Sequence, residues 1–349
     1  MSLLSRFKFL RHSLWISYVL LSLGVVFTGW LIYRLGVQDI WGYLKTLGWN
    51  FFPFLLPSFL SFFFLSWAWL QFLKNNRPTP PFFHLWMVKV VGEAVNNINP
   101  LGWGGGDPVR IYLLKKWVSI PKGTASVVID RTLHTMALVV FMIIGMIIAF
   151  LKFSFPPTLE LGFILALAFM FIMTLYWYRR QHEGVFEFLI DTLTRLKIKK
   201  HWSPQTLQKA KEIDQLISQF YLHNRMGFAT AFLFQFMARL LVVVEIFVAA
   251  YFLKTPLSWD TAYLLGSVTA IVNMVFVLLP SSVGALEGAY AGFFHLLNQD
   301  PAIGTSIQIL RRLRMVVWSS LGFIYIYHLD RNTRLELKKE LSRQAESNR

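Results

Sequence analysis

The residues best suited to chemistry lie in one polar stretch, from Val95 to Arg110, between two apolar segments. The stretch contains three asparagines, four glycines, two prolines, one acid and one base. An irregular backbone with many donors and acceptors is tolerated at membrane depth only inside protein or around a water-filled cavity. The stretch therefore predicts a binding or transport site.

A second interruption, from Pro280 to Gly288, has the same spacing of key residues as the first. In each, a proline is followed at plus four by a glycine and at plus seven by an acid: Pro100, Gly104 and Asp107, and Pro280, Gly284 and Glu287. Paired glycine and proline interruptions at corresponding points of two halves are the best sequence indication of a transporter's binding site. We expect two broken or re-entrant helical segments, related by an internal inverted repeat, that face a shared cavity.

Charged residues inside apolar segments are expected to line that cavity, because a charge on the lipid face at mid-bilayer costs about 2.5 to 3.5 kcal/mol on insertion scales. The predicted substrate-binding or transport residues are Glu93, Asn96, Asn97, Asp107, Arg110, Asp130, Arg131, Arg239, Glu287 and Arg312. The predicted helix breaks are Pro100, Gly104, Gly105, Gly106, Pro280 and Gly284. Glu93, Asp107 and Glu287 would bind a cationic or hydroxylated headgroup, or a coupling proton.

Each basic residue also has a purely structural interpretation. The planar guanidinium of Arg131 suits phosphate oxygens, but it can equally form an interior ion pair that locks helices together. Arg239 and Glu245 are six residues apart on one span, so each needs a different partner, and packing is as plausible as transport. Arginines at a helix end usually snorkel toward the interface, so which of Arg311, Arg312 and Arg314 faces the cavity stays open.

The composition indicates a polytopic membrane protein that positions these residues. The 349 residues are 55% hydrophobic, and the mean hydropathy is +0.50. The net charge of +16 does not indicate nucleic-acid binding, because lysines and arginines cluster beside apolar segments, as the positive-inside bias and anionic lipid headgroups require. Without cysteine, HExxH spacing or a P-loop, we expect no metal, disulfide or nucleotide cofactor.

The apolar runs predict an all-α bundle that crosses the cell membrane several times, with both termini in the cytoplasm. The spans are expected at 14–33, 51–73, 124–151, 159–178, 227–253, 262–279 and a last stretch that ends near Leu329. The piece at 82–98 is too short and too polar for a lipid-exposed span, which favours a re-entrant or broken helix.

The whole chain, 1–349, is predicted to be one integral membrane domain. Its first half, 14–178, contains a broken segment at 82–122, and its second half, 226–329, contains one at 280–298. A basic, cytoplasmic linker at 179–225 joins the halves, and 330–349 forms a cytoplasmic tail. Within the linker, Ser203 and Pro204 begin a helix with apolar residues at helical spacing, which either lies on the membrane surface or caps the bundle.

At these motifs the chain resembles the lysylphosphatidylglycerol synthase transmembrane region family, also called flippase-like or UPF0104 proteins. The matching residues are Asn97, Pro100, Gly105, Gly106, Asp107 and Arg110, then Asp130 and Arg131, then Pro280, Gly284 and Glu287, and finally Arg312 before Gly322. Two residues depart from the family pattern: Asp107 stands where glutamate is expected, and His134 stands where aspartate is common.

The resemblance implies a lipid translocase. The chain is expected to be a stand-alone member, because its longest non-membrane segment, 179–225, has no room for the soluble synthase domain. Two other interpretations stay open: a membrane enzyme that acts on a polyprenyl- or hopanoid-type lipid, and an ion-coupled transporter of small solutes. Neither the lipid cargo, the direction and energy source of transport, nor the oligomeric state follows from the sequence.

Overall fold

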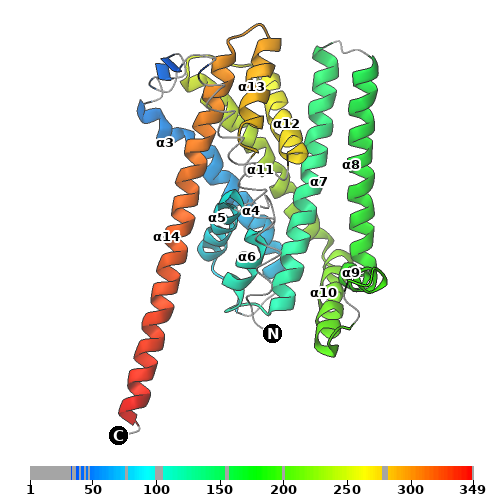
Figure 1. Cartoon of the computed structure of the whole chain (residues 1–349), viewed down its shortest axis with the longest axis vertical. Helices are drawn as coiled ribbons and strands as arrows, with labels where there is room; N and C mark the ends of the chain where they lie inside the picture. The colour runs from blue at the N-terminus through cyan, green and yellow to red at the C-terminus, as the bar shows by residue number, and fades with distance from the viewer. Residues whose placement is uncertain are drawn as a thin grey trace.

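The computed structural model describes residues 33, 37–38, 41–42, 45, 48–74, 78–98, 105–153, 157–198, 201–276 and 282–347. Within these ranges every regular element is a helix, which confirms the predicted all-α class for this part of the chain. Figure 1 shows an elongated bundle, with α14 (Pro301–Ser347) on one side and α7 (Ile120–Lys152) and α8 (Pro157–Glu183) on the other.

Among the described residues, four helical stretches are long and apolar enough to cross a membrane. They are Gly48–Leu73, Ile120–Lys152, Glu160–Glu183 and Arg225–Phe252. These stretches correspond to the spans predicted at 51–73, 124–151, 159–178 and 227–253. The predicted span at 14–33 lies outside the described residues, apart from Tyr33.

The span predicted at 262–279 corresponds to α12 (Trp259–Val275), and the last apolar stretch lies within α14. With 17 residues, α12 is about 25 Å long, somewhat shorter than the hydrocarbon core of a bilayer. By its length alone, α12 does not cross the full hydrocarbon core of a bilayer.

Helix starts follow ordinary capping chemistry. Before α7, the Ser119 hydroxyl accepts a hydrogen bond from the backbone N–H of Lys122, and Pro121 occupies the first turn. Asn224 caps α11 (Arg225–Phe252) through the backbone N–H of Gly227. Each of these two long helices therefore starts at a polar N-cap residue that precedes its apolar run.

Two pairs of short helices lie in opposite halves of the bundle. In the lower half of Figure 1 are α5 (Phe82–Ile98) and α6 (Gly106–Leu114), and in the upper half are α12 and α13 (Ala285–Leu296). The second helix of each pair is about 14 to 18 Å long, which is too short to span a bilayer. Each pair leads into a long helix, α7 or α14.

The centre of the bundle is formed by α4 (Leu56–Leu73) and α11, which pack along one another. Phe64 stacks on Phe234 with ring centroids 5.7 Å apart, and the Ser61 hydroxyl donates to the carbonyl of Ala238. The largest apolar core surrounds α11 through α14, with Ile246 and Tyr290 fully buried. One short-helix pair contacts this central layer through α5, which packs on α4, and the other through α12, which packs on α11.

At the lower right of Figure 1, α9 (Val185–Arg195) and α10 (Pro204–His223) pack against the ends of the long helices. The Asp214 carboxylate of α10 accepts the backbone N–H groups of Phe186 and Glu187, which caps α9. The apolar side of α10 is buried against the bundle through residues such as Ile213 and Ile217. The linker helix therefore packs its apolar side on protein in this structure.

Candidate functional site

The first polar cluster is organised around Asp107, in the first turn of α6. Its carboxylate accepts three hydrogen bonds from Arg131 of α7, from Nε at 3.0 and 3.2 Å and from a terminal nitrogen at 2.8 Å. Arg110, one turn later on α6, contacts the same carboxylate at 3.3 Å. One acid therefore holds two guanidinium groups, in the side-on geometry that makes arginine–carboxylate pairs strong.

Glycines allow the helices that carry this cluster to approach closely. A Cβ on Gly106 would lie 2.0 Å from the carbonyl oxygen of Gly92, and a Cβ on Gly92 would lie 2.0 Å from Arg110 Nε. The Asn96 side chain accepts the backbone N–H of Gly106 at 2.9 Å, which ties the end of α5 to the start of α6. Small residues here serve to place Arg110 and Asp107 against α5.

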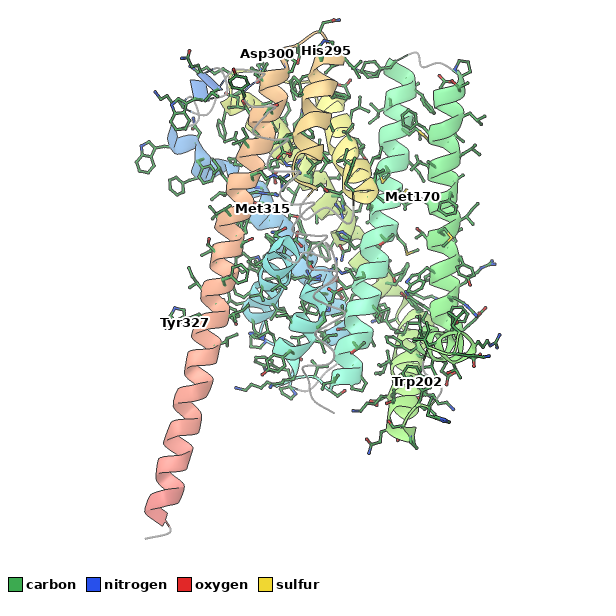
Figure 2. All side chains as sticks on the ribbon, viewed as in Figure 1. Met170, Trp202, His295, Asp300, Met315 and Tyr327 are labelled. Carbon is green, nitrogen blue, oxygen red and sulfur yellow. The ribbon has the colours of Figure 1, made fainter. Side chains whose placement is uncertain are left out.

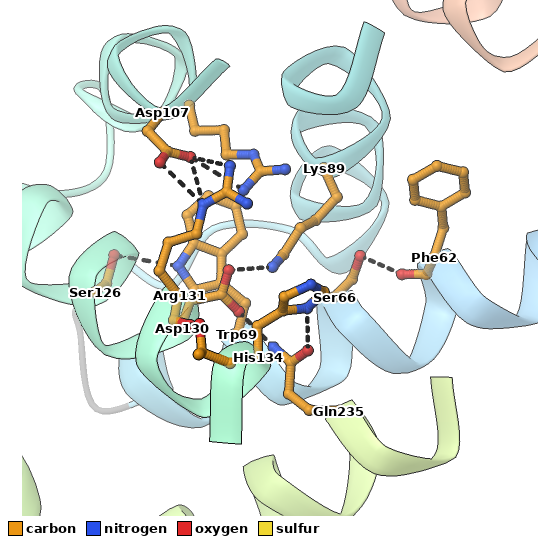
Figure 3. A network of polar contacts seen from close by, with 12 residues as sticks. Phe62, Ser66, Trp69, Lys89, Asp107, Ser126, Asp130, Arg131, His134 and Gln235 are labelled. Atoms are coloured by element: carbon orange, nitrogen blue, oxygen red, sulfur yellow. Dashed lines mark hydrogen bonds and ion pairs between the residues drawn. The ribbon is translucent and has the colours of Figure 1, made fainter. Parts of the chain in front are cut away.

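Beside this cluster, a buried chain of polar contacts links three helices (Figure 3). Lys89 of α5 forms an ion pair with Asp130 of α7 at 2.5 Å, and Gln235 of α11 donates to the other oxygen of Asp130. The Gln235 carbonyl accepts from His134 Nδ1, and His134 Nε2 contacts Arg239. Because Nε2 must accept from the guanidinium, this arrangement requires neutral His134 with its proton on Nδ1.

The second polar cluster is organised around Glu287, in the first turn of α13. Its carboxylate binds Arg312 of α14, with Nε at 2.7 Å and a terminal nitrogen at 3.3 Å. The same carboxylate accepts the backbone N–H of Gly284 at 2.8 Å, where the backbone has a φ of +82°. Glycine is favoured there because other residues rarely adopt positive φ. The turn before α13 and the position of the Glu287 carboxylate are therefore linked by this hydrogen bond.

Next to it, Glu245 of α11 binds two further arginines of α14. Arg311 Nε donates to one carboxylate oxygen at 2.9 Å, and Arg314 binds the other. Arg311 also donates to the hydroxyls of Thr269 and Tyr290, so neutral side chains of α12 and α13 complete its environment. Glu245 and Glu287 are both only 1% exposed, and their arginines shield them from the surrounding apolar residues.

The two clusters share one design. In each, the acid lies in the first turn of a short helix, and its arginine lies on the long helix that follows, 24 residues after Asp107 and 25 residues after Glu287. Arg131 and Arg312 each come eleven residues after the first residue of their helix, which is about 16 Å along it. Since α7 and α14 begin at opposite ends of the bundle, the arginines enter it from opposite sides (Figure 1).

The structure places the other predicted residues as follows. Glu93 is exposed, and it lies close enough to Arg131, Arg239 and Arg314 to interact electrostatically with all three. Asn97 donates to the hydroxyl of Ser319 on α14 at 3.2 Å. Gly105 precedes α6 as its N-cap residue. The predicted breaks Pro100, Gly104 and Pro280 lie outside the described residues.

Several members of the clusters were not among the predicted site residues: Lys89, His134, Gln235, Glu245, Thr269, Tyr290, Arg311 and Arg314. A charge inside an apolar run was the available signal for Lys89 and Glu245, and no pattern distinguishes Gln235 or Tyr290 from ordinary packing residues. No group of histidine and acidic side chains that could hold a metal ion occurs among the described residues.

The model of the family described as "Lysylphosphatidylglycerol synthase TM region" matches residues 14–322. The chain belongs to this family. Both acid–arginine pairs, with every polar residue described above, lie in the part of the chain that this family's model covers. The match identifies the family of this membrane protein. The activity of this lysylphosphatidylglycerol synthase TM region protein has to be inferred from the geometry of its site.

Two archaeal relatives are similar to this family member. A "UPF0104 membrane protein" of Methanothermobacter thermautotrophicus is 24% identical over 238 residues, which is 66% of this chain and 70% of the relative. Another of the same description, from Methanocaldococcus jannaschii, is 26% identical over 275 residues, 74% of this chain and 79% of the relative. No solved structure gives a significant match.

Proposed function

We propose that this protein transports a lipid across the cell membrane and that the two acid–arginine clusters bind the polar headgroup while the acyl chains stay in the bilayer. The observation that carries the proposal is the presence of Asp107–Arg131 and Glu287–Arg312 on helices that enter the bundle from opposite ends. Charged side chains at membrane depth usually mark a transport pathway.

An internal inverted repeat would explain this arrangement. Adding 180 to residue numbers brings the first residues of α5, α6 and α7 within three residues of those of α12, α13 and α14. The same shift relates Asp107 to Glu287, and α4 to α11 at the centre of the bundle. Under this proposal, α5 with α6 and α12 with α13 are two re-entrant hairpins, and transport alternates access between the two sides of a shared cavity.

The partial exposure of the arginines supports a binding role. The side chains of Arg131 and Arg312 are 26% and 20% exposed, whereas the carboxylate of Glu287 is buried beneath Arg312. The Arg131 guanidinium binds Asp107 through Nε and one terminal nitrogen, and its open side keeps a donor for a phosphate oxygen. A headgroup phosphate then competes with the acid, so that binding and release need only small movements of the arginine.

A translocation assay in proteoliposomes tests the proposal. The purified protein is reconstituted with fluorescent or native phospholipids, and the appearance of lipid in the opposite leaflet is measured for wild type, Asp107→Asn, Glu287→Gln and the control Asp191→Asn. Asp191 pairs with Arg195 on an exposed face of α9, so its loss should leave transport unchanged. Unchanged transport in both Asp107→Asn and Glu287→Gln would refute the proposed roles.

The same preparation separates this proposal from enzymatic activity on a lipid-linked substrate. If the protein is an enzyme, mass spectrometry of the lipids recovered after the assay will detect a chemically altered lipid. A transporter returns the lipid unchanged. Transport of water-soluble solutes with no lipid movement would instead favour a solute transporter.

We also propose that the end of the bundle that carries α9 and α10 faces the cytoplasm and contacts anionic lipid headgroups. Lys115, Lys116, Lys122 and Arg179 lie at or near this end, as the positive-inside rule requires. The chain contains no cysteine, so single cysteines report topology directly. Ser203→Cys should be protected from an impermeant maleimide in intact cells, and Ser258→Cys should be labelled; the reverse pattern would contradict this orientation.

A further inference from the structure

The two polar clusters contain more positive than negative charge. Their basic residues are Lys89, Arg110, Arg131, Arg239, Arg311, Arg312 and Arg314, and their acidic residues are Glu93, Asp107, Asp130, Glu245 and Glu287. With seven bases against five acids, the described residues of the two clusters have an excess of two positive charges. The Lys89–Asp130 pair is neutral in sum wherever its proton lies, so it does not alter this excess.

The excess arises at specific places. Asp107 is shared by Arg110 and Arg131, and Glu245 is shared by Arg311 and Arg314, so each acid neutralises only one of its two arginines. The Nε atoms of Arg110 and Arg314 are buried and have no hydrogen-bond partner. Buried donors are normally satisfied, so an unpaired one in each cluster indicates a missing acceptor.

Arg239 adds a third uncompensated positive charge. Its contact in the polar chain is with neutral His134, and it makes no ion pair with any carboxylate in the part of the chain that the structure describes. Glu93 is the nearby acid without an ion pair among those residues, and it offsets one of the three charges. A cation inside a membrane protein normally pairs with an anion, because burying it alone is costly.

Among the residues that the structure describes, no other acid pairs with the arginines of the two clusters. The segments that join the short helices, 99–104 and 277–281, contain no aspartate or glutamate. Of the other acids, Asp300, labelled in Figure 2, and Asp260, in the first turn of α12, lie at one end of the bundle, and α9 and α10, which carry Asp191 and Asp214, lie at the other (Figure 1). Figure 2 places Met315, next to Arg314, well below the end of α14 that is marked by Asp300. The missing negative charge is therefore expected from a ligand.

We infer that the headgroup which this protein binds carries a net negative charge, in the form of a phosphate or diphosphate without a compensating ammonium group. The inference rests on the proposed transport function and narrows its substrate class. It favours an anionic glycerophospholipid or a polyprenyl phosphate over a zwitterionic or aminoacylated lipid, because an added ammonium would restore the excess that the phosphate removes. The three partly exposed arginines, Arg131, Arg312 and Arg314, supply the phosphate donors.

Competition among lipids of different charge tests this inference. Proteoliposomes of one bulk composition receive tracer amounts of phosphatidylglycerol, phosphatidylethanolamine or lysylphosphatidylglycerol, and translocation of each is measured. We expect phosphatidylglycerol to be transported at least tenfold faster than the other two. Equal or faster transport of either competitor would overturn the inference and leave the proposed function standing, whereas no transport of any lipid would overturn both.

Two variants with opposite expected effects on lipid binding distinguish an effect of charge from a general loss of folding. Arg239→Gln should weaken binding of phosphatidylglycerol to the detergent-solubilised protein by about tenfold or more, because it removes one of the excess positive charges that attract the phosphate. Glu93→Gln should tighten binding, because it increases the positive excess. Native mass spectrometry measures both, with Arg195→Gln on exposed α9 as the matched control. Weaker binding in Glu93→Gln, or an unchanged affinity in Arg239→Gln, would contradict the inference.

Discussion

Arg312 binds Glu287 side-on, with Nε 2.7 Å and a terminal nitrogen 3.3 Å from its two carboxylate oxygens. The pair joins the first turn of α13 to the interior of α14, and the acid is buried while the arginine is partly open. The guanidinium is therefore oriented before any ligand arrives, which reduces the entropic cost of binding. Asp107 and Arg131 form the equivalent pair between α6 and α7.

Replacing Arg312 by lysine tests whether this geometry matters beyond charge. Arg312→Lys keeps the positive charge but loses the planar, two-donor contact with Glu287. We expect at least a tenfold loss of lipid transport with little change in expression or melting temperature. Arg195→Lys on the exposed surface is the control. Full activity of Arg312→Lys would mean that charge alone suffices at this position.

The buried Lys89–Asp130 pair is expected to be a strong determinant of stability. Both side chains are 4% exposed, so Lys89→Met leaves an unpaired buried carboxylate and should cost about 3 to 5 kcal/mol. The double variant Lys89→Met/Asp130→Asn removes both charges and should recover much of that loss. Thermal unfolding in detergent measures each variant, and additive losses in the double variant would argue against the pairing.

Close packing between α5 and α6 predicts a strong effect at Gly106. A Cβ there would overlap the carbonyl of Gly92, so Gly106→Ala should destabilise the protein by about 1 to 3 kcal/mol and displace Asp107 from Arg131. Gly162 on α8 has no atom within 4 Å of an added Cβ, and Gly162→Ala should instead stabilise its helix by up to about 1 kcal/mol. Melting temperatures of the two variants should therefore shift in opposite directions.

The hydroxyl of Tyr290 is expected to stabilise the second cluster. It accepts from Arg311 at 3.0 Å in a fully buried position, so Tyr290→Phe removes an acceptor without creating a large cavity. The expected cost is about 1 to 3 kcal/mol, measured as a lower unfolding temperature. Tyr251→Phe, at a side chain that is 63% exposed, should change the unfolding temperature very little. Equal shifts in the two variants would show that the hydrogen bond contributes nothing specific.

The sequence predicted the long helices and the central acids of both clusters. Hydropathy located the four apolar stretches within a few residues, because a span must match the thickness of the bilayer. The repeated spacing of proline, glycine and acid selected Asp107 and Glu287, since both residues stand at a helix start where polar residues interrupt an apolar context. A charge inside an apolar run selected Arg131, and the family resemblance selected Arg312 among the arginines at 311–314. The structure pairs both arginines with those acids.

Partner choice could not be predicted, because it depends on how distant helices pack. Glu245 and Arg239 lie on the same helix, yet Glu245 binds arginines of α14 and Arg239 contacts His134 of α7. All three arginines at 311–314 bind acids, so none is a simple interfacial residue. Helical periodicity assigns a residue to one face of its helix, but it does not say which helix packs on that face. For Glu245 the partner Arg311 lies 66 residues later in the chain.

The most direct test of the proposed transport function is lipid translocation by the double variant Arg131→Gln/Arg312→Gln. The two substitutions remove one headgroup donor from each of the two opposed clusters and leave the apolar surface of the bundle unchanged. Wild-type proteoliposomes should move lipid faster than protein-free liposomes, and the double variant should fall to the protein-free rate while it keeps its helical circular dichroism. Wild-type translocation rates in the folded double variant would contradict the account.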